Sequence, residues 1–320
     1  MTSATSKPKV CNPETDMRYL HLDVFTDRPF EGNQLAVFPE PAGLTTHDMQ
    51  TITREMNFSE CTFIFPAEGA GTGRVRMRIF TPGEELPMAG HPTIGSTFAL
   101  VAEGVIERGR ENFVFELGIG PTPVSLEWEE DRLSFAWMTQ PLPTFGEPLA
   151  EPAAIAAAVG IGERDLAADL PVQMVSCGVP FLFIPIASRQ AVDSVSVDRK
   201  ALARCCRNAG LDELPAFFFT TDGAGKNGGS AGTVYSRMLA PGFGITEDPA
   251  TGSASGPLGC YLVHHEVVSS EAARNIISLQ GVAMKRPSRI YISIDSRDGG
   301  ISRVRVGGKS VMVGRGELTV

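Results

Sequence analysis

E-L-P-M-A-G-H, at residues 85–91, has a near copy later in the chain, E-D-P-A-T-G-S at residues 247–253. Glutamate, proline and glycine hold the same places in both stretches without a gap. An R-M pair precedes each copy, at residues 76–77 in the first and at 237–238 in the second. Apolar runs that fit buried helices follow both copies. The duplication predicts two similar halves whose helix N-termini face one shared cleft.

A weaker likeness extends the duplication to other segments. Residues 56–65 (M-N-F-S-E-C-T-F-I-F) parallel residues 210–219 (G-L-D-E-L-P-A-F-F-F), and this alignment makes Glu60 and Glu213 equivalent. No period of about 20 to 50 residues recurs, so the chain contains one duplication and is not a solenoid. Many short strands with about two helices per half predict an α+β fold, in which each half wraps a curved sheet around one apolar helix.

Apolar periodicity and turn signals predict the individual elements. The expected helices are 47–56, capped by Thr45-Thr46, then 90–103, 199–209 and 255–267. The expected strands are 19–25, 35–38, 61–65, 74–80, 112–117, 122–128 and 132–138 in the first half, and 172–177, 181–186, 216–221 and 234–239 in the second. Four prolines at 141, 143, 148 and 152 predict a linker, and the glycine-rich residues 222–232 predict an exposed loop.

Composition and charge exclude several classes of protein. The 320 residues suffice for two domains, and 42% hydrophobic with 20% charged residues is typical of a globular chain. A net charge of −9 argues against a broad basic face for nucleic acid. No apolar run reaches the roughly 18 residues of a membrane span. Residues 1–17 are polar and predict a disordered tail, not a signal peptide. We expect a cytoplasmic protein without nucleic-acid or membrane partners.

The cysteines and glycines give no sign of a metal or nucleotide. Six cysteines, at 11, 61, 177, 205, 206 and 260, form no C-x-x-C motif. This pattern indicates free thiols in a reducing compartment. The glycine-rich loop lacks the residue order of a P-loop, and no G-x-G-x-x-G opens a βαβ unit. We therefore predict neither a metal nor a nucleotide cofactor.

Both copies of the motif place glycines where a helix is expected to begin. The first N–H groups of a helix lack internal acceptors, and the helix dipole favours anions there. Glycine also lets a ligand approach the backbone closely. One such junction is more often ordinary capping by threonine or serine. Two equivalent junctions favour a site that holds a carboxylate from both sides.

Three ionisable side chains lie beside these junctions. Glu60 falls between a helix end and an apolar strand, where partial desolvation would raise its pKa toward that of a general acid/base. Taken singly, Glu60 fits a solvated or capping residue, and His91 fits a structural histidine. Asp248 alone fits an Asx-turn residue. Their joint placement by the duplication favours a catalytic site.

These residues belong to stretches that resemble the PhzF family of phenazine-biosynthesis proteins. G-H-P-T-I-G and E-D-P-A-T-G-S-A are specific to that family. Gln34 departs from it, because the family usually has proline there. The matching stretches follow in order through nearly the whole chain: 21–38, 57–65, 88–95, 244–258, 280–288 and 306–318.

The resemblance implies a diaminopimelate-epimerase-like fold, which is α+β with two similar lobes, each an antiparallel barrel-like sheet around a central helix. The N-terminal lobe would comprise residues 18–135 and a returning strand at 309–320. The C-terminal lobe would comprise residues 136–308, with the active site between the lobes. The resemblance also implies a homodimer that uses no metal or organic cofactor.

The resemblance further assigns roles to residues. Glu60 matches a glutamate that moves a proton between ring carbons, and His91 and Asp248 match residues that surround the substrate. Epimerases of this fold use two cysteines as acid and base, and their equivalents here are Ala89 and Thr251. Neither can transfer a proton as a thiol does, which disfavours a two-thiol racemase. The substrate contacts implied by the resemblance are Gly90, Pro92, Thr93, Gly252, Ser253 and Asn33.

We therefore hypothesise a cofactor-independent isomerase of a small carboxylic acid, similar to the family member that isomerises trans-2,3-dihydro-3-hydroxyanthranilate. The Glu60 carboxylate would remove a proton from one carbon and return it to another. Two alternatives stay open. One is an epimerase or lyase that acts on an amino-acid-like substrate, and the other is a small-molecule-binding protein without catalysis.

Overall fold

The computed structural model describes residues 16–66, 74–222 and 233–319. Most of the predicted tail, residues 1–15, and nearly all of the predicted glycine-rich loop, residues 223–232, lie outside the described residues. Asp16 and Met17 were also assigned to the tail, but they open the first strand. The reason is that Met17 is apolar and packs, 3% exposed, in a hydrophobic cluster beneath the first helix.

The described strands form one 18-stranded sheet that continues from one lobe into the other. In the first lobe they are β1 (Asp16–Val24), β2 (Asn33–Phe38), β3 (Glu60–Pro66), β4 (Arg74–Phe80), β5 (Glu85–Leu86), β6 (Asn112–Leu117), β7 (Gly120–Glu129), β8 (Arg132–Gln140) and β18 (Ser310–Thr319). In the second they are β9 (Thr144–Pro148), β10 (Gln173–Ser176), β11 (Pro180–Pro185), β12 (Ala216–Thr220), β13 (Thr233–Ala240), β14 (Ile245–Asp248), β15 (Ile276–Gln280), β16 (Ser288–Arg297) and β17 (Gly300–Gly308).

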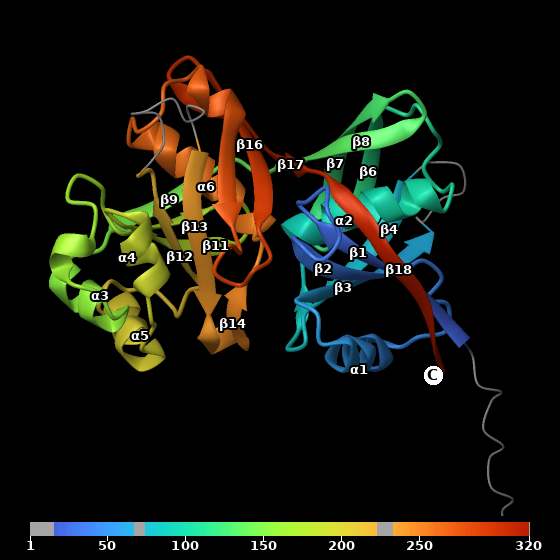
Figure 1. Ribbon diagram of the computed structural model, residues 1–320, viewed down its shortest axis with the longest axis horizontal. Helices are drawn as coiled ribbons and strands as arrows, with labels where there is room; N and C mark the ends of the chain where they lie inside the picture. Colours follow the sequence, from blue (N-terminus) through green and yellow to red (C-terminus); the bar gives the residue numbers. More distant parts are fainter. Residues whose placement is uncertain (1–15, 67–73, 223–232, 320) are drawn as a thin grey trace, which may run out of the picture.

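Two antiparallel strands connect the lobes. Residues 136–140 at the end of β8 pair with residues 304–308 at the end of β17, so each strand leaves its own lobe to reach the other (Figure 1). The chain then returns to the first lobe as β18, which pairs with β1 along its length. This exchange fixes the position of one lobe against the other.

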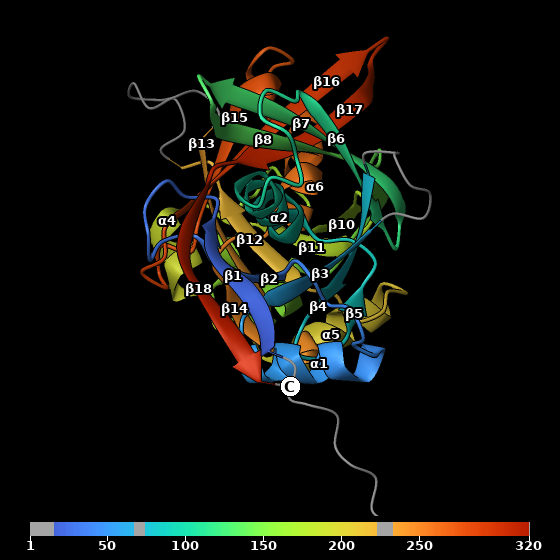
Figure 2. The same cartoon turned by 90° about the vertical axis from the view of Figure 1, so that its right-hand side faces the viewer.

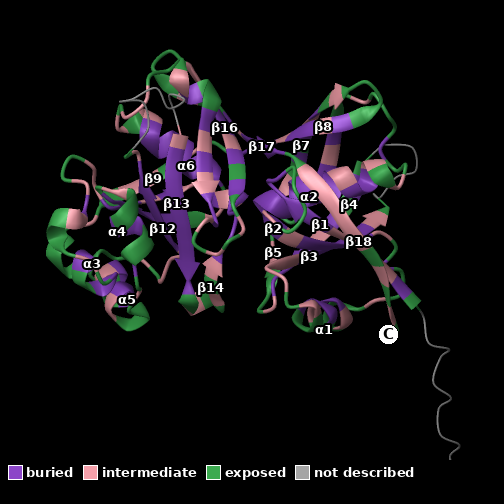
Figure 3. Cartoon of the chain, in the orientation of Figure 1, coloured by how far each residue is buried: buried purple, intermediate pink, exposed green. Residues whose placement is uncertain are grey.

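Each lobe surrounds one nearly fully buried helix, α2 in the first and α6 in the second. Figure 2 shows α2 encircled by strands, and Figure 3 shows buried residues concentrated in α6, β12 and β13. Both helices are apolar on all sides, which suits a helix with no solvent face. The helices are α1 (Thr46–Met56), α2 (Gly90–Ala102), α3 (Pro152–Ala158), α4 (Arg189–Ser194), α5 (Arg199–Asn208) and α6 (Gly252–His264), with 3-10 turns at Glu163–Asp165, Pro241–Phe243 and Ala272–Asn275. None of the described helices is long and apolar enough to cross a membrane.

The predicted elements are present with shifted ends, and Thr45 caps α1 through a capping box as predicted. Helix α6 begins at Gly252 and not at Ser255, so both Gly252 and Ser253 lie in its first turn. The predicted linker contains β9, which within the described parts of the chain pairs with β10 alone. An edge strand tolerates prolines, which explains why proline content was misleading here.

The strand register corrects the alignment of the two copies. Ile79 pairs with Leu86, and Met238 pairs with Asp248. Leu86 and Asp248 hold the same place in the motif, so the counterpart of Arg237 is Arg78 and not Arg76. A bulge and a 3-10 turn lengthen the second hairpin and shift the spacing.

The register also removes the proposed equivalence of Glu60 and Glu213. Cys61 pairs with β4 as Ala216 pairs with β13, so Glu60 corresponds to Pro215. Glu213 instead forms a surface ion pair with Arg199, at 2.7 Å. Only the first lobe therefore has a carboxylate at this position.

Candidate active site

The two helix starts meet where the lobes touch. A Cβ atom added to Gly90 would lie 2.5 Å from the Cα atom of Gly252, so the two glycine backbones are in direct contact. Neither N-cap residue, Ala89 or Thr251, caps its helix with a side chain. Two uncapped helix N-termini thus lie side by side, an arrangement that favours an anionic ligand.

Glu60, which is mostly buried, and His91, which is buried, form a pair beside these helix starts. Glu60 Oε2 lies 3.3 Å from His91 Nε2, and the side chains are 13% and 3% exposed. Neither atom has a hydrogen-bond partner among the described residues. Burial raises the pKa of Glu60 well above its ordinary value, and the nearby Asp248 carboxylate raises it further. Burial lowers the pKa of His91 to about 3, so this imidazole is neutral at physiological pH.

Unlike the facing atoms of Glu60 and His91, the carboxylate of Asp248 accepts several hydrogen bonds. Its Oδ1 atom accepts from Asn33 Nδ2 at 2.8 Å and from Ser59 Oγ at 3.0 Å. Its Oδ2 atom accepts from Thr251 Oγ1 at 2.5 Å. Burial raises the pKa of Asp248 to about 6, and the three donors act against this rise. Because Glu60 accepts no comparable bond from the described residues, Asp248 is the first of the two carboxyl groups to ionise.

Asn33 connects the two lobes at the site. It begins β2 and is 1% exposed. Besides Asp248, its Nδ2 atom contacts the carbonyl oxygen of Ala250 at 3.0 Å and His91 Nδ1 at 3.2 Å. One amide therefore holds the histidine of the first lobe against the carboxylate of the second.

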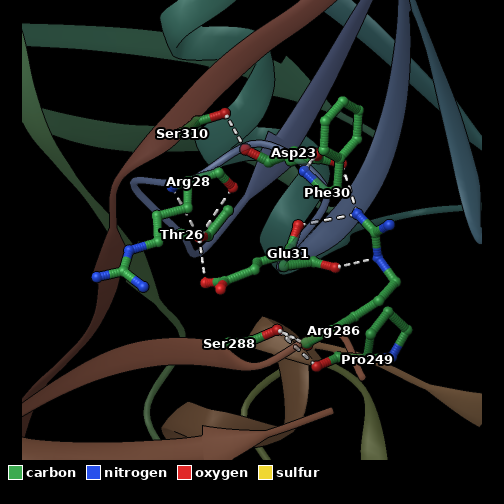
Figure 4. A network of polar contacts seen from close by, with 10 residues as sticks. Asp23, Thr26, Arg28, Phe30, Glu31, Pro249, Arg286, Ser288 and Ser310 are labelled. Atoms are coloured by element: carbon green, nitrogen blue, oxygen red, sulfur yellow. Dashed lines mark hydrogen bonds and ion pairs between the residues drawn. The ribbon is translucent and has the colours of Figure 1, made fainter. Parts of the chain in front are cut away.

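A separate inter-lobe contact fixes the loop that leads to Asn33 (Figure 4). Arg286 Nη2 lies 2.6 Å from Asp23 Oδ1, and its Nε donates to the carbonyl oxygen of Gly32 at 2.8 Å. The other carboxylate oxygen of Asp23 accepts from the N–H of Phe30 at 2.6 Å. The ion pair thus closes the turn between β1 and β2 and positions the residue that follows it.

The remaining predicted contacts lie in the first turns of the two helices. Gly252 is buried and Ser253 is partly exposed. Pro92 has no N–H to offer, and the buried Thr93 hydroxyl donates to the carbonyl oxygen of Ala89 at 2.8 Å. These two residues therefore shape the helix start, while a ligand would meet the backbone of Gly90.

Sequence reasoning missed two residues that contact Asp248 and its neighbours. Ser59 directly precedes Glu60 and donates a hydrogen bond to Asp248, and its place next to a candidate site residue could have suggested it. Gln280 ends β15 and bonds Thr251, and only its place in a family-like stretch marked it.

The cysteine beside the Glu60–His91 pair is not set up as a nucleophile. Cys61 follows Glu60, but burial raises the pKa of its thiol to about 12, so it is not a reactive thiolate. In residues 16–66, 74–222 and 233–319, no group of three or more His, Cys, Asp or Glu side chains could hold a metal ion.

The family profile and the sequence comparisons place the chain in one family. The profile of phenazine biosynthesis-like proteins matches residues 22–316. A trans-2,3-dihydro-3-hydroxyanthranilate isomerase of Pseudomonas aeruginosa is 34% identical over 299 residues, covering 93% of this chain and 98% of that protein. An uncharacterized isomerase of Mesorhizobium japonicum is 36% identical over 307 residues, covering 94% and 98%. A PhzF-family structure from Bacillus anthracis has a TM-score of 0.82 at 23% identity, covering 96% of this chain and 100% of that one, which confirms the predicted fold.

Proposed function

The chain belongs to the phenazine biosynthesis-like (PhzF) family of isomerases, and we propose that it moves a proton between two carbons of a small carboxylic acid without a cofactor. The observation that carries this proposal is the Glu60–His91 pair. Its two facing atoms, Glu60 Oε2 and His91 Nε2, are shielded from solvent and have no hydrogen-bond partner among the described residues, and the pair lies beside two uncapped helix starts. The name of the Pseudomonas aeruginosa relative suggests trans-2,3-dihydro-3-hydroxyanthranilate as the first substrate to test.

In the proposed reaction, ionised Glu60 removes a proton from a carbon atom of the substrate. Its raised pKa makes the carboxylate a stronger base and lets it retain the proton between two steps. The electron pair of the broken C–H bond moves toward the substrate carboxylate, where the helix N–H groups stabilise the developing charge. Protonated Glu60 then returns the proton to a second carbon, so the reaction involves no net oxidation.

His91 and Asp248 have supporting roles in this proposal. Neutral His91 remains beside Glu60 but does not compete for the proton, because its own pKa is about 3. The Asp248 carboxylate raises the pKa of Glu60 and, through Asn33, orients the imidazole.

Glu60→Gln tests the proposal, because glutamine keeps the shape of the side chain but cannot carry the proton. We expect kcat to fall about 10²–10⁴-fold, the usual loss for a positioned acid/base. Calorimetry should show that the substrate still binds. Turnover by this variant at the wild-type rate would contradict the proposal.

The epimerase alternative lacks a matched pair of acid and base. The positions of the two epimerase cysteines hold Ala89 and Thr251, and only Thr251 has a hydroxyl, which already donates to Asp248. A racemic product with solvent deuterium at its stereocentre would nevertheless select that alternative. Homodimer formation and a cytoplasmic location stay predictions.

A further inference from the structure

The two lobes differ in one group of three residues around the duplicated motif. In the second lobe the group is polar: Asp248, Thr251 and Gln280. Strand and motif positions give their counterparts in the first lobe, which are Leu86, Ala89 and Leu117. Ala89 and Leu117 belong to the hydrophobic core of the first lobe, and Leu86 packs against it. The fold thus accepts an apolar group at these positions, and the polar group of the second lobe needs a separate reason.

The glycines after Gln280 and Leu117 confirm that these two residues are equivalent. A Cβ added to Gly281 would lie 2.5 Å from the carbonyl oxygen of Pro249. A Cβ added to Gly118 would lie 2.9 Å from the Cα atom of Pro87. Each strand therefore ends against the proline of its own motif, and the two positions share one backbone environment.

Gln280 is fully buried, and its three hydrogen bonds determine which way its amide points. Its Oε1 atom accepts from the N–H of Thr251 at 3.0 Å. Its Nε2 atom donates to the carbonyl oxygen of Asp248 at 2.8 Å and to Thr251 Oγ1 at 2.9 Å. A flipped amide would place oxygen against the Asp248 carbonyl and nitrogen against the Thr251 N–H, so the partners allow one orientation.

This orientation also sets the direction of the threonine hydroxyl. A hydroxyl carries one proton. Because Thr251 Oγ1 accepts from Gln280, its own proton is free to donate, and Asp248 Oδ2 lies 2.5 Å away. We infer that Gln280 is a positioning residue, which holds Thr251 as a permanent donor so that Asp248 stays anionic beside Glu60.

The charges around Asp248 show why such a donor is required. Glu247, which precedes Asp248 on β14, opposes a negative charge on Asp248. Asp248 also repels the carboxylate of Glu60, which lies on β3. Arg237 donates hydrogen bonds to both carboxylate oxygens of Glu247, at 2.9 and 2.8 Å, and the imidazole of His91 is neutral. Neither side chain therefore supplies a positive charge to Asp248. The ionised state therefore depends on the hydroxyl and amide donors, one of which Gln280 orients.

Titration of Asp248 tests the inference without any substrate. The protein is labelled with ¹³C at the aspartate carboxyl carbons and titrated by NMR. The signal of Asp248 is identified because it is absent from the spectrum of Asp248→Asn. We expect Gln280→Leu, which introduces the first-lobe residue, to raise the pKa of Asp248 by about one unit, a tenfold change in ionisation. Gln280→Met keeps the unbranched shape and should give the same rise if the leucine variant does not fold.

Matched variants separate this role from a merely structural one. Gln173 is also a buried glutamine of the second lobe, 4% exposed, and bonds Gly146 and His265 away from the site. Gln173→Leu should lower the melting temperature but leave the titration of Asp248 unchanged. Thr251→Val should reproduce the rise, and Thr251→Ser, which keeps the hydroxyl, should not.

Wild-type titration of Asp248 in folded Gln280→Leu or Gln280→Met would overturn the inference. The inference rests on the proposed function for its catalytic meaning, yet its readout needs no turnover. A shifted titration in an enzyme that never isomerises an acid would refute the proposed function alone. An unshifted titration in an active isomerase would refute the positioning role alone.

Discussion

The two lobes share one backbone plan but contribute different chemistry to the site. Both place a glycine at the start of a buried helix, and both pair an arginine with the motif glutamate. The first lobe contributes Glu60 and His91, whereas the second has Pro215 and Ser253 at the corresponding places. The second lobe contributes Asp248 and its polar partners. In the proposed function, the first lobe supplies the group that carries the proton and the second lobe supplies a carboxylate that stays ionised, so one backbone plan supports two different tasks.

The largest expected effect concerns the two equivalent arginines. Arg237 should contribute much more to the free energy of unfolding than Arg78. Arg237 and Glu247 are 10% and 15% exposed, and Arg237 Nη1 also donates to the carbonyl oxygen of Val192 at 3.0 Å. Arg78 and Glu85 are 21% and 39% exposed. Breaking a buried pair typically costs about 3–5 kcal/mol, and a surface pair less than about 1 kcal/mol. Urea unfolding of Arg237→Leu and Arg78→Leu should show this contrast, and equal costs would break the comparison.

The contact between the two helix starts should be needed for activity, because both lobes contribute residues to the site. Gly90→Ala places a methyl group 2.5 Å from the backbone of Gly252, so the lobes have to separate. Displacing a catalytic group by about 1 Å can cost about 10²-fold in rate, and we expect a loss of this size in kcat. Gly314→Ala is the control, because no atom lies within 4 Å of its added Cβ. A fully active Gly90→Ala would show that the contact is dispensable.

The buried histidine of the first lobe makes stability depend on pH. The folded state binds its proton only near pH 3, but the unfolded state binds it near pH 6.5. Between these values the unfolded state binds more protons, so His91 makes the protein less stable as pH falls. The raised pKa of Asp248 acts in the opposite direction between its ordinary 3.8 and about 6.

Replacing the histidine isolates its contribution from that of Asp248. His91→Asn should lose less stability than the wild type between pH 6.5 and about 4.5, by about 2 kcal/mol. Chemical unfolding at several pH values measures this difference. Parallel stability curves for the two proteins would mean that the imidazole is not held neutral.

Neutralising Asp248 should have the smallest effect of these changes. It should lower the pKa of Glu60, which belongs to the other lobe. Asp248→Asn removes a negative charge near Glu60, which is one cause of the raised pKa of Glu60. The pKa of Glu60 should fall, and the acidic limb of the kcat/KM profile should move to lower pH. An acidic limb that stays in place would show that the two carboxyl groups do not interact.

Much of the site could be predicted, because the motif copies mark both helix starts and Glu60 lies in a distinctive stretch. What the sequence could not provide is register. The R-M pairs aligned Arg76 with Arg237, but a bulge in the second hairpin makes Arg78 the counterpart. Gln280 was missed for a related reason, since its partner Thr251 lies 29 positions away and only the sheet brings the two together. Pro148 of β9 and the three prolines that flank this strand suggested a linker, because a short edge strand that contains a proline resembles a linker in sequence.

The account depends on Glu60 as the group that moves the carbon-bound proton. Its most direct test is NMR observation of trans-2,3-dihydro-3-hydroxyanthranilate in D₂O with the wild type, Glu60→Gln and Asp248→Asn. We predict that the wild type forms product in which the second carbon carries the substrate's own hydrogen, that Asp248→Asn forms the same product more slowly, and that Glu60→Gln forms none. Product formation by Glu60→Gln at the wild-type rate would contradict the account.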